Sequence, residues 1–200
     1  MNIGTGYGLA FSSGINAYLP LLSFSISARF FHLYKVNPNF SYITQDWFMI
    51  ALAILTLVDI FADKIPVVDH VWDMIHTVLR PIAGAIVAAA SQEQLTGPGL
   101  PVVLVLGAGL AGMVHTTKAT TRVAATAMTA GFLNTVMSIV EDIIVVLTTA
   151  LSLLMPVVMV MLLIVFVGVF LFVVPRVVRV LRRRRYRGKS RTASLSGEGS

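Results

Sequence analysis

The sequence predicts an all-α membrane protein of about six transmembrane or re-entrant helices, and three observations support that fold class. The 200 residues are 56% hydrophobic and 12% charged, with a mean hydropathy of +0.85, whereas soluble domains average about a quarter charged residues. Apolar stretches near the roughly 20 residues that one bilayer crossing needs recur along the chain. Charged residues in and beside them repeat at helical spacing, which predicts a polar core.

The first apolar stretch, residues 7–31, is predicted to be a broken helix. A polar run that contains glycine, from Ser12 to Asn16, interrupts it, and Pro20 follows shortly after. Backbone that leaves the helical conformation at membrane depth is tolerated only where it is buried in protein or lines a cavity. We therefore expect this break to lie inside the protein.

The middle of the chain is expected to contain three more helices. A second span runs over about 47–62 and ends before Pro66, because a proline disfavours helix in the residue that precedes it. A third helix covers about 69–91. The turn at 97–101, which contains two prolines, opens a fourth span.

The last apolar region is expected to contain two elements. After a segment of small residues that extends to Gly131, another helix runs to about Met155. Residues 143–174 carry no charge, and as one helix these 32 residues would measure about 48 Å, well beyond the roughly 30 Å hydrocarbon core. We therefore divide the region at Pro156, which leaves a fifth element and a last span of 19 residues.

The positive charge of the chain lies at its C-terminal end. Residues 176–200 hold nine Lys/Arg and one acid, whereas residues 1–175 hold six Lys/Arg and eight acids. We expect a multi-pass domain over 1–181 and a basic, disordered tail over 182–200 that contacts anionic lipid headgroups, with no nucleic-acid partner. Arginines directly after the last span place the C-terminus in the cytoplasm, and six spans would place the N-terminus there too. The absence of cysteine excludes disulfides and thiolate chemistry.

Polar side chains at spacings of three and four residues share one face of each of four apolar segments. A charge at the bilayer centre costs about 2.5–3.5 kcal/mol, so these side chains should face inward and pair, with Arg80 bound across the core to Glu141 or Asp142. We predict that the following residues line a substrate path or a buried polar network: Asn16, Asp59, Asp73, His76, Arg80, His115, Lys118, Arg122, Asn134, Ser138, Glu141 and Asp142.

Simpler interpretations of several of these residues stay open. His76 and His115 could be hydrogen-bonded core residues without a further role. Lys118 and Arg122 could extend to the lipid headgroups. An internal repeat is also possible, since residues 74–77 resemble residues 113–116 in sequence, and repeats with broken helices are typical of transporters.

Four motifs stand in order between residues 9 and 150. They are Ser13-Gly14-Ile15-Asn16-Ala17-Tyr18-Leu19-Pro20, the run from Ala62-Asp63-Lys64-Ile65-Pro66 through Trp72-Asp73, His76-Thr77 and Arg80-Pro81 to Gly84-Ala85, then His115-x-x-Lys118-Ala119-x-x-Arg122, and Ser138-x-x-Glu141-Asp142. As a set they resemble the domain of unknown function 4126 family of small bacterial inner-membrane proteins. The resemblance implies a multi-pass protein of the bacterial plasma membrane and no established activity.

The charge pattern favours a small transporter or channel-like protein. Between residues 59 and 142, apart from Glu93 in a loop, six acids oppose four bases in and beside the apolar segments. A cation or a proton is therefore favoured over an anion. Two alternatives stay open: a structural or assembly membrane protein, and a membrane-embedded enzyme that acts on a lipid-linked phosphate. The enzyme would hold a divalent metal between Asp59, Asp63, Asp69 and Asp73. No cofactor is evident and no nucleotide, nucleophile-elbow or zinc motif occurs, so an enzyme is the less favoured class.

Overall fold

The computed structural model describes residues 3–62, 66–129, 132–173 and 175–176, with the side chains at 66–71, 73, 123–129 and 132–135 left out. Its described regular elements are all helical. They are α1 (Ile3–Ser13), α2 (Leu19–Arg29), the 3-10 helix η1 (Pro38–Thr44), α3 (Asp46–Ala62), α4 (Pro66–Ala90), α5 (Gly99–Thr129), α6 (Phe132–Leu154) and a last helix, Pro156–Val173.

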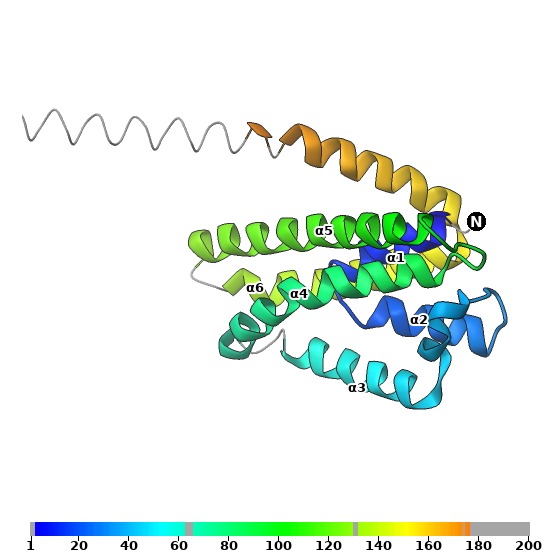
Figure 1. The fold of residues 1–200 in the computed structure, drawn as a ribbon. Helices are drawn as coiled ribbons and strands as arrows, with labels where there is room; N and C mark the ends of the chain where they lie inside the picture. Colours follow the sequence, from blue (N-terminus) through cyan, green and yellow to red (C-terminus); the bar gives the residue numbers. More distant parts are fainter. Residues whose placement is uncertain (1–2, 63–65, 130–131, 174, 177–200) are drawn as a thin grey trace, which may run out of the picture. The chain divides into compact units, whose positions relative to one another are not determined.

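The chain divides into two compact units, Met1–Val160 and Met161–Ser200. In the first unit, α3 ends, α4 begins, α5 ends and α6 begins at the same end, which we call the turn end (Figure 1). The opposite end carries the connections 30–45 and 91–98 and is called the loop end. These two connections are joined there, because the side-chain amide of Asn37 donates to the backbone carbonyls of Gln92 and Leu95, at 2.8 Å each.

The break in the first apolar stretch is confirmed, and the chain turns back at it. With 11 residues each, α1 and α2 measure about 16 Å, roughly half of the hydrocarbon core. Along α1, Gly4 abuts Pro156 and Ser12 hydrogen-bonds Thr148, so α1 runs antiparallel to α6 from the loop end inward. The two short helices therefore form a hairpin whose tip, residues 14–18, lies inside the first unit.

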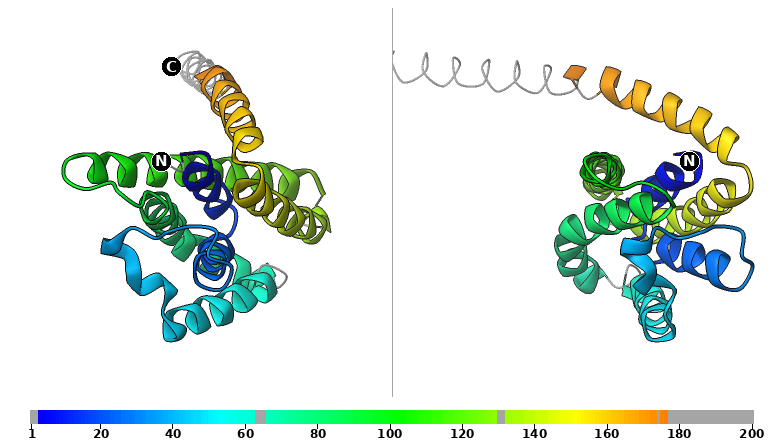
Figure 2. Two further views of the ribbon diagram at one scale, coloured as in Figure 1. Left: turned by 90° about the vertical axis from the view of Figure 1, so that its right-hand side faces the viewer. Right: turned by 45° about the vertical axis from the view of Figure 1, so that its right-hand side comes forward.

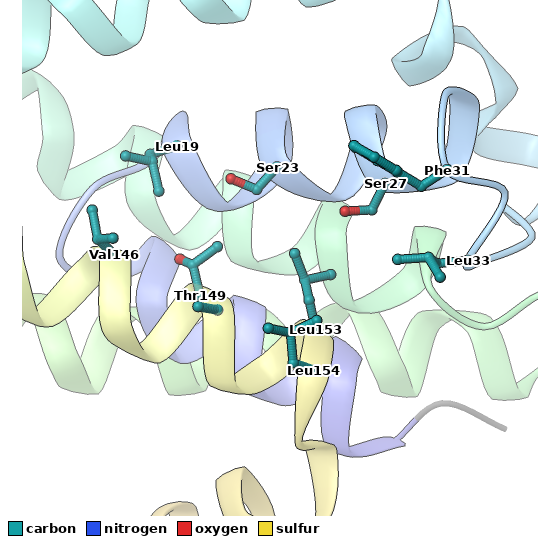
Figure 3. A pocket seen from close by; sticks show the side chains of 10 residues that line it. Leu19, Ser23, Ser27, Phe31, Leu33, Val146, Thr149, Leu153 and Leu154 are labelled. Carbon is teal, nitrogen blue, oxygen red and sulfur yellow. The ribbon is translucent and has the colours of Figure 1, made fainter.

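A pocket of about 580 Å³ lies between α2 and α6, and the order of the residues that line it shows in which direction α2 runs. Leu19, at the start of α2, lies across from Val146, whereas Phe31 and Leu33, beyond its end, lie toward the end of α6 that carries Leu153 and Leu154 (Figure 3). The second helix thus runs parallel to α6 and returns to the loop end. Apolar side chains dominate the lining, and none of the predicted polar-network residues contributes to it.

The first helix of the hairpin is enclosed by its neighbours. It packs against α2, α4, α5 and α6, and in the view along the bundle it lies between them (Figure 2). Small residues permit this, because a Cβ on Gly6 or Gly8 would overlap the hydroxyl of Ser91 or Ser152. A buried hairpin of this kind meets the condition under which non-helical backbone is tolerated at membrane depth.

The most extensive helix packing joins α4 and α5. The two backbones approach closely where Gly84 and Gly107 face one another, since a Cβ on either would stand within 3 Å of the other's carbonyl oxygen. Small residues allow such close helix contact in membranes, where dispersion and hydrogen bonding replace the hydrophobic effect as the source of affinity between helices.

The all-α membrane fold class is confirmed, but the count of spans changes. Among the described residues, three helical segments are long and apolar enough to cross a bilayer, namely 99–122, 136–154 and 156–173, or four if η1 and α3, which meet at 63°, form one bent span. The sequence analysis predicts six elements, which is somewhat more than three or four. One reason is that residues 7–31 form a hairpin of two half-length helices rather than a crossing.

Other boundaries agree with the sequence analysis. Helix α3 occupies the expected second span, α4 begins three residues before the expected third helix, and the chain breaks before Pro156 as expected. Helix α5 is longer than expected, because it continues as one helix to Thr129. In the second unit, the guanidinium of Arg176 lies 3.9 Å from the ring centroid of Phe172, and the tail beyond it is outside the described residues.

Candidate functional site

The tip of the hairpin is held by its own side chains and by α5. Asn16 is buried, and its Oδ1 accepts hydrogen bonds from the backbone N–H groups of Tyr18 and Leu19, at 3.0 and 2.9 Å. This satisfies two of the donors that the start of α2 leaves open. Gly14 fits against α5, where a Cβ would lie 2.5 Å from the carbonyl oxygen of Ala111.

A buried carboxylate, an indole and an imidazole meet near the turn end. The indole Nε1–H of Trp72 donates to Oδ1 of Asp59 at 2.7 Å, and Nε2 of His76 lies 3.3 Å from the same oxygen. The other ring nitrogen of His76, Nδ1, lies 2.8 Å from the backbone oxygen of Trp72. The ring of Tyr18, from the hairpin tip, stands edge-on to His76 with centroids 5.5 Å apart. The tip and two helices thus surround one ionisable pair.

A second cluster lies one turn further along α4. Arg80 is completely buried, and its NH1 lies 2.7 Å from Nδ1 of His115 on α5. Because a guanidinium has no acceptor, Arg80 donates and Nδ1 of His115 accepts. The remaining proton of a neutral ring then resides on Nε2, which lies 3.2 Å from Oγ1 of Thr77.

Helices α5 and α6 contribute a third cluster around Glu141. Its carboxylate accepts from Arg122, with NH2 at 2.7 Å and Nε at 3.3 Å, and it also lies 3.1 Å from Nζ of Lys118. All three side chains are largely buried. Lys118 also donates to the backbone carbonyl of Ile15 at 3.3 Å. This contact joins the ionic cluster to the hairpin tip.

The structure therefore brings seven of the sequence-predicted residues into three clusters near the tip, and an eighth, Asn16, lies in the tip itself. They are Asn16, Asp59, His76, Arg80, His115, Lys118, Arg122 and Glu141. We call these residues, together with Tyr18 and Trp72, the tip network. Because each cluster contains contacts between different elements, it depends on the packing of the hairpin and of α3 to α6.

Of the four remaining predicted residues, the structure describes the side chains of two. Ser138 is buried on α6 and Asp142 is partly buried beside Glu141. The side chains of Asp73 and Asn134 lie outside the described residues. In the described contacts Glu141 is bound by Arg122 and Lys118, not by the expected Arg80, since both cations on α5 face it directly.

The alternative metal site is only partly covered by the described structure. The side chains of Asp63, Asp69 and Asp73 lie outside it, and Oδ1 of Asp59 is engaged by Trp72 and His76. Within the part of the chain that the structure describes, no group of three or more His or acidic side chains could hold a metal ion.

Sequence reasoning from helical spacing did not single out three participants. Trp72, Tyr18 and the carbonyl of Ile15 are neither charged nor part of a polar stripe, although all three stand in the ordered motifs between residues 9 and 150. Trp72 could have been found from its position, which lies one helical turn before His76. The carbonyl carries no sequence signal of its own.

Fold and site together define the class: an integral membrane protein with a buried helical hairpin and a network of ionisable side chains. Residues 3–176 match the family described as domain of unknown function (DUF4126), so the chain belongs to that family and the expected resemblance is confirmed. Comparisons with curated proteins and with solved structures give no match.

Proposed function

We propose that this protein is a small transporter or channel-like protein of the bacterial plasma membrane and that the tip network lines its ion path. The observation that supports it most is the contact of Lys118 with the carbonyl of Ile15 at a helix break inside the bundle. Broken helices whose free carbonyls face a cation are a recurring device of ion-coupled transporters. Ionisable groups at membrane depth are costly and are commonly functional.

The charge arrangement favours a cation or a proton. The C-terminal end of α1 carries the negative end of its helix dipole, and Lys118 occupies the place where a mobile cation would bind. Glu141 holds the same ammonium group, at 3.1 Å. Neutralising Glu141 would weaken its ionic contact with Lys118. The carbonyl groups at the C-terminal end of α1 would then be available to a mobile cation.

Topology follows from the arginines after the last helix, which favour a cytoplasmic C-terminus. Because the hairpin returns to the end from which it enters, it adds no crossing. We count as crossings the three long apolar segments, the bent pair of η1 and α3, and α4, whose apolar part Met74–Ala90 is shorter. These five crossings would place the N-terminus on the external side, whereas six spans would place it in the cytoplasm. The turn end, with Arg122 and Glu141, would face the cytoplasm.

The test is flux in liposomes. Purified protein is reconstituted with an internal pH dye, and proton, sodium and potassium movements are followed under an imposed membrane potential. We expect cation or proton flux in the wild type and its loss in Glu141→Gln and Lys118→Met. The matched controls are Glu93→Gln and Lys35→Met, which alter a solvent-exposed pair of the same residue types.

Two results would count against this function. One is wild-type flux no greater than that of empty liposomes for all three cations. The other is equal flux in the buried-pair variants and their exposed-pair controls. Either result would favour a structural or assembly role for the network.

A further inference from the structure

We propose that the pocket between α2 and α6 binds a neutral isoprenoid quinone, held through the carbonyl oxygens of its ring by hydroxyl groups of both helices. The pocket has a volume of about 580 Å³, which lies within the range of about 300–1,000 Å³ that is usual for ligand sites. The tip network does not line it. This inference therefore goes beyond the proposed function and does not rest on it.

The pocket is elongated and follows one stripe of each helix. On α2 the lining residues Leu19, Ser23 and Ser27 are four apart, and on α6 the lining extends from Val146 to Leu154 (Figure 3). Eight residues of either helix measure about 12 Å. Val146 and Leu154 are 53% and 72% exposed, and in a bilayer such side chains contact lipid tails. A molecule dissolved in the bilayer can therefore enter the pocket from the side.

One hydroxyl group in the lining is buried without a partner. Thr149 is 3% exposed, and its Oγ1 makes no hydrogen bond among the described residues. Hydroxyls inside helices often donate to the carbonyl four residues earlier. Two other residues of α6 do so, since Thr148 donates to Ile144 at 2.8 Å and Ser152 donates to Thr148 at 2.6 Å. The Thr149 hydroxyl lacks the bond that these residues make.

The wall formed by α2 shows the same contrast. Ser25 is fully buried and donates to the carbonyl of Leu21 at 2.8 Å. Ser23 and Ser27 line the pocket instead, and the described contacts include no hydrogen bond of their hydroxyl groups. Both walls thus present hydroxyl donors to one apolar space. Because a buried hydroxyl without a partner is costly, an occupant with acceptors on two sides would be stabilised.

The lining favours an uncharged occupant. All ten residues that line the pocket are uncharged. Arg29 follows Ser27 by two residues, but its guanidinium lies 2.8 Å from Asp46 and donates to the carbonyl of Thr44. A buried anion needs a cation or several donors. The phosphate of a phospholipid and the carboxylate of a fatty acid are therefore disfavoured here.

A quinone has the chemistry that this pocket would recognise. A plain hydrocarbon chain offers no acceptor and would leave the hydroxyl groups unpaired. A quinone ring is flat and uncharged, and its two carbonyl oxygens stand on opposite edges. One oxygen accepts from Ser23 or Ser27 while the other accepts from Thr149, and the isoprenoid tail contacts the apolar residues of the lining. Binding forms or breaks no covalent bond and transfers no electron.

The test is equilibrium binding of decylubiquinone to the full-length protein in detergent. Native mass spectrometry gives the stoichiometry, and the rise of the melting temperature with ligand concentration gives the affinity. We expect saturable binding of one molecule per chain. Dioctanoylglycerol, which is neutral, and dioctanoyl phosphatidylglycerol, which is anionic, should bind more weakly. Absence of saturable decylubiquinone binding, or equal or tighter binding of either lipid, would overturn the assignment.

Thr149→Val tests the unpartnered hydroxyl, because it replaces that group by a methyl group of nearly the same size. We expect decylubiquinone to bind about fivefold more weakly, which is the effect of losing one neutral hydrogen bond. Without ligand the melting temperature should be unchanged or higher, since the change removes an unpaired buried hydroxyl. A hydroxyl that served only the fold would give the opposite pattern, with unchanged affinity and a lower melting temperature.

Two further variants complete the test. Ser25→Ala is the matched control on α2, because this hydroxyl bonds its own helix, and it should keep the wild-type affinity. Ala150→Phe places a ring in the pocket from an exposed lining position and should block binding. If Thr149→Val does not fold, Ala150→Phe decides. Undiminished binding in Ala150→Phe would mean that the quinone binds elsewhere and would contradict the proposal.

Discussion

The ion pairs Lys118–Glu141 and Lys35–Glu93 have nearly the same length, 3.1 and 3.2 Å, but lie in different surroundings. The Lys118 and Glu141 side chains are 5% and 13% exposed, whereas those of Lys35 and Glu93 are 80% and 42% exposed. The first pair contacts the hairpin tip, and the second stands on the loop end. Distance alone therefore does not distinguish a structural or functional pair from a solvated one; burial does.

The surroundings determine what each pair can do. Water and salt screen the loop-end pair, so it contributes little to stability and changes little when it is broken. The inner carboxylate is shared by two cations from α5 in a setting where charge is poorly solvated. Such a group is costly to break and responds strongly to the protonation of a neighbour. This is the property that a coupled ion path requires.

The largest expected effect comes from removing the shared carboxylate. Glu141→Ala leaves the buried cations Arg122 and Lys118 without it, and breaking a buried pair costs about 3–5 kcal/mol. Glu93→Ala, the matched change on the loop end, is expected to cost no more than about 1 kcal/mol. Reversible unfolding in mixed detergent micelles measures both.

A double-mutant cycle sharpens the same contrast. Arg122→Ala combined with Glu141→Ala should cost less than the sum of the two single changes, because both changes remove the same ion pair. Lys35→Ala with Glu93→Ala should be additive. Additivity in the inner cycle would mean that the contacts of Glu141 carry little coupling energy.

The packing that encloses the network gives the next largest effect. Gly107→Ala places a methyl group 2.6 Å from the carbonyl oxygen of Gly84, and we expect a loss of about 1–3 kcal/mol from overpacking. Gly109→Ala is the control, since a Cβ there meets no atom within 4 Å and alanine favours helix over glycine. Equal thermal stability of the two variants would show that the α4–α5 contact is looser than described.

Helical spacing predicted which side chains would gather, because a mid-helix charge in an apolar segment has few places other than the interior. It identified the helix break at Ser12 to Asn16 and the stripes on α4 to α6. It did not identify every partner. Arg80 is predicted to bind Glu141 or Asp142, whereas Glu141 is bound by Lys118 and Arg122, and the contact described for Arg80 is with His115. The rotation of one helix relative to another decides which faces meet.

The number of spans was also beyond the sequence. The apolar length of residues 7–31 is sufficient for a crossing, and only the packing of α1 and α2 along α6 shows that the chain returns. Backbone groups such as the carbonyl of Ile15 are present at every residue, so nothing in the sequence indicates the one that Lys118 binds.

A smaller effect is expected at the tip itself. Asn16→Ala removes the acceptor of the two N–H groups at the start of α2, and loss of such a cap costs about 1 kcal/mol. Asn39→Ala, on an exposed residue of the loop end, should leave the unfolding free energy within about 0.5 kcal/mol of the wild type. Thermal melts of both proteins in one detergent provide the comparison, and equal losses would remove the distinction between tip and loop end.

The smallest effect is expected from the basic tail. Truncation after Val180 removes most of the C-terminal arginines but keeps Arg176, which lies against the ring of Phe172 at the end of the last helix. Charges in the tail interact with anionic headgroups at about 1 kcal/mol each, and a neutral detergent offers no such partner. The melting temperature in neutral detergent should therefore be unchanged, whereas binding of the intact chain to anionic lipid should exceed that of the truncated chain. A lower melting temperature after truncation would mean that the tail packs on the multi-pass domain, and the boundary near residue 181 would then have to move.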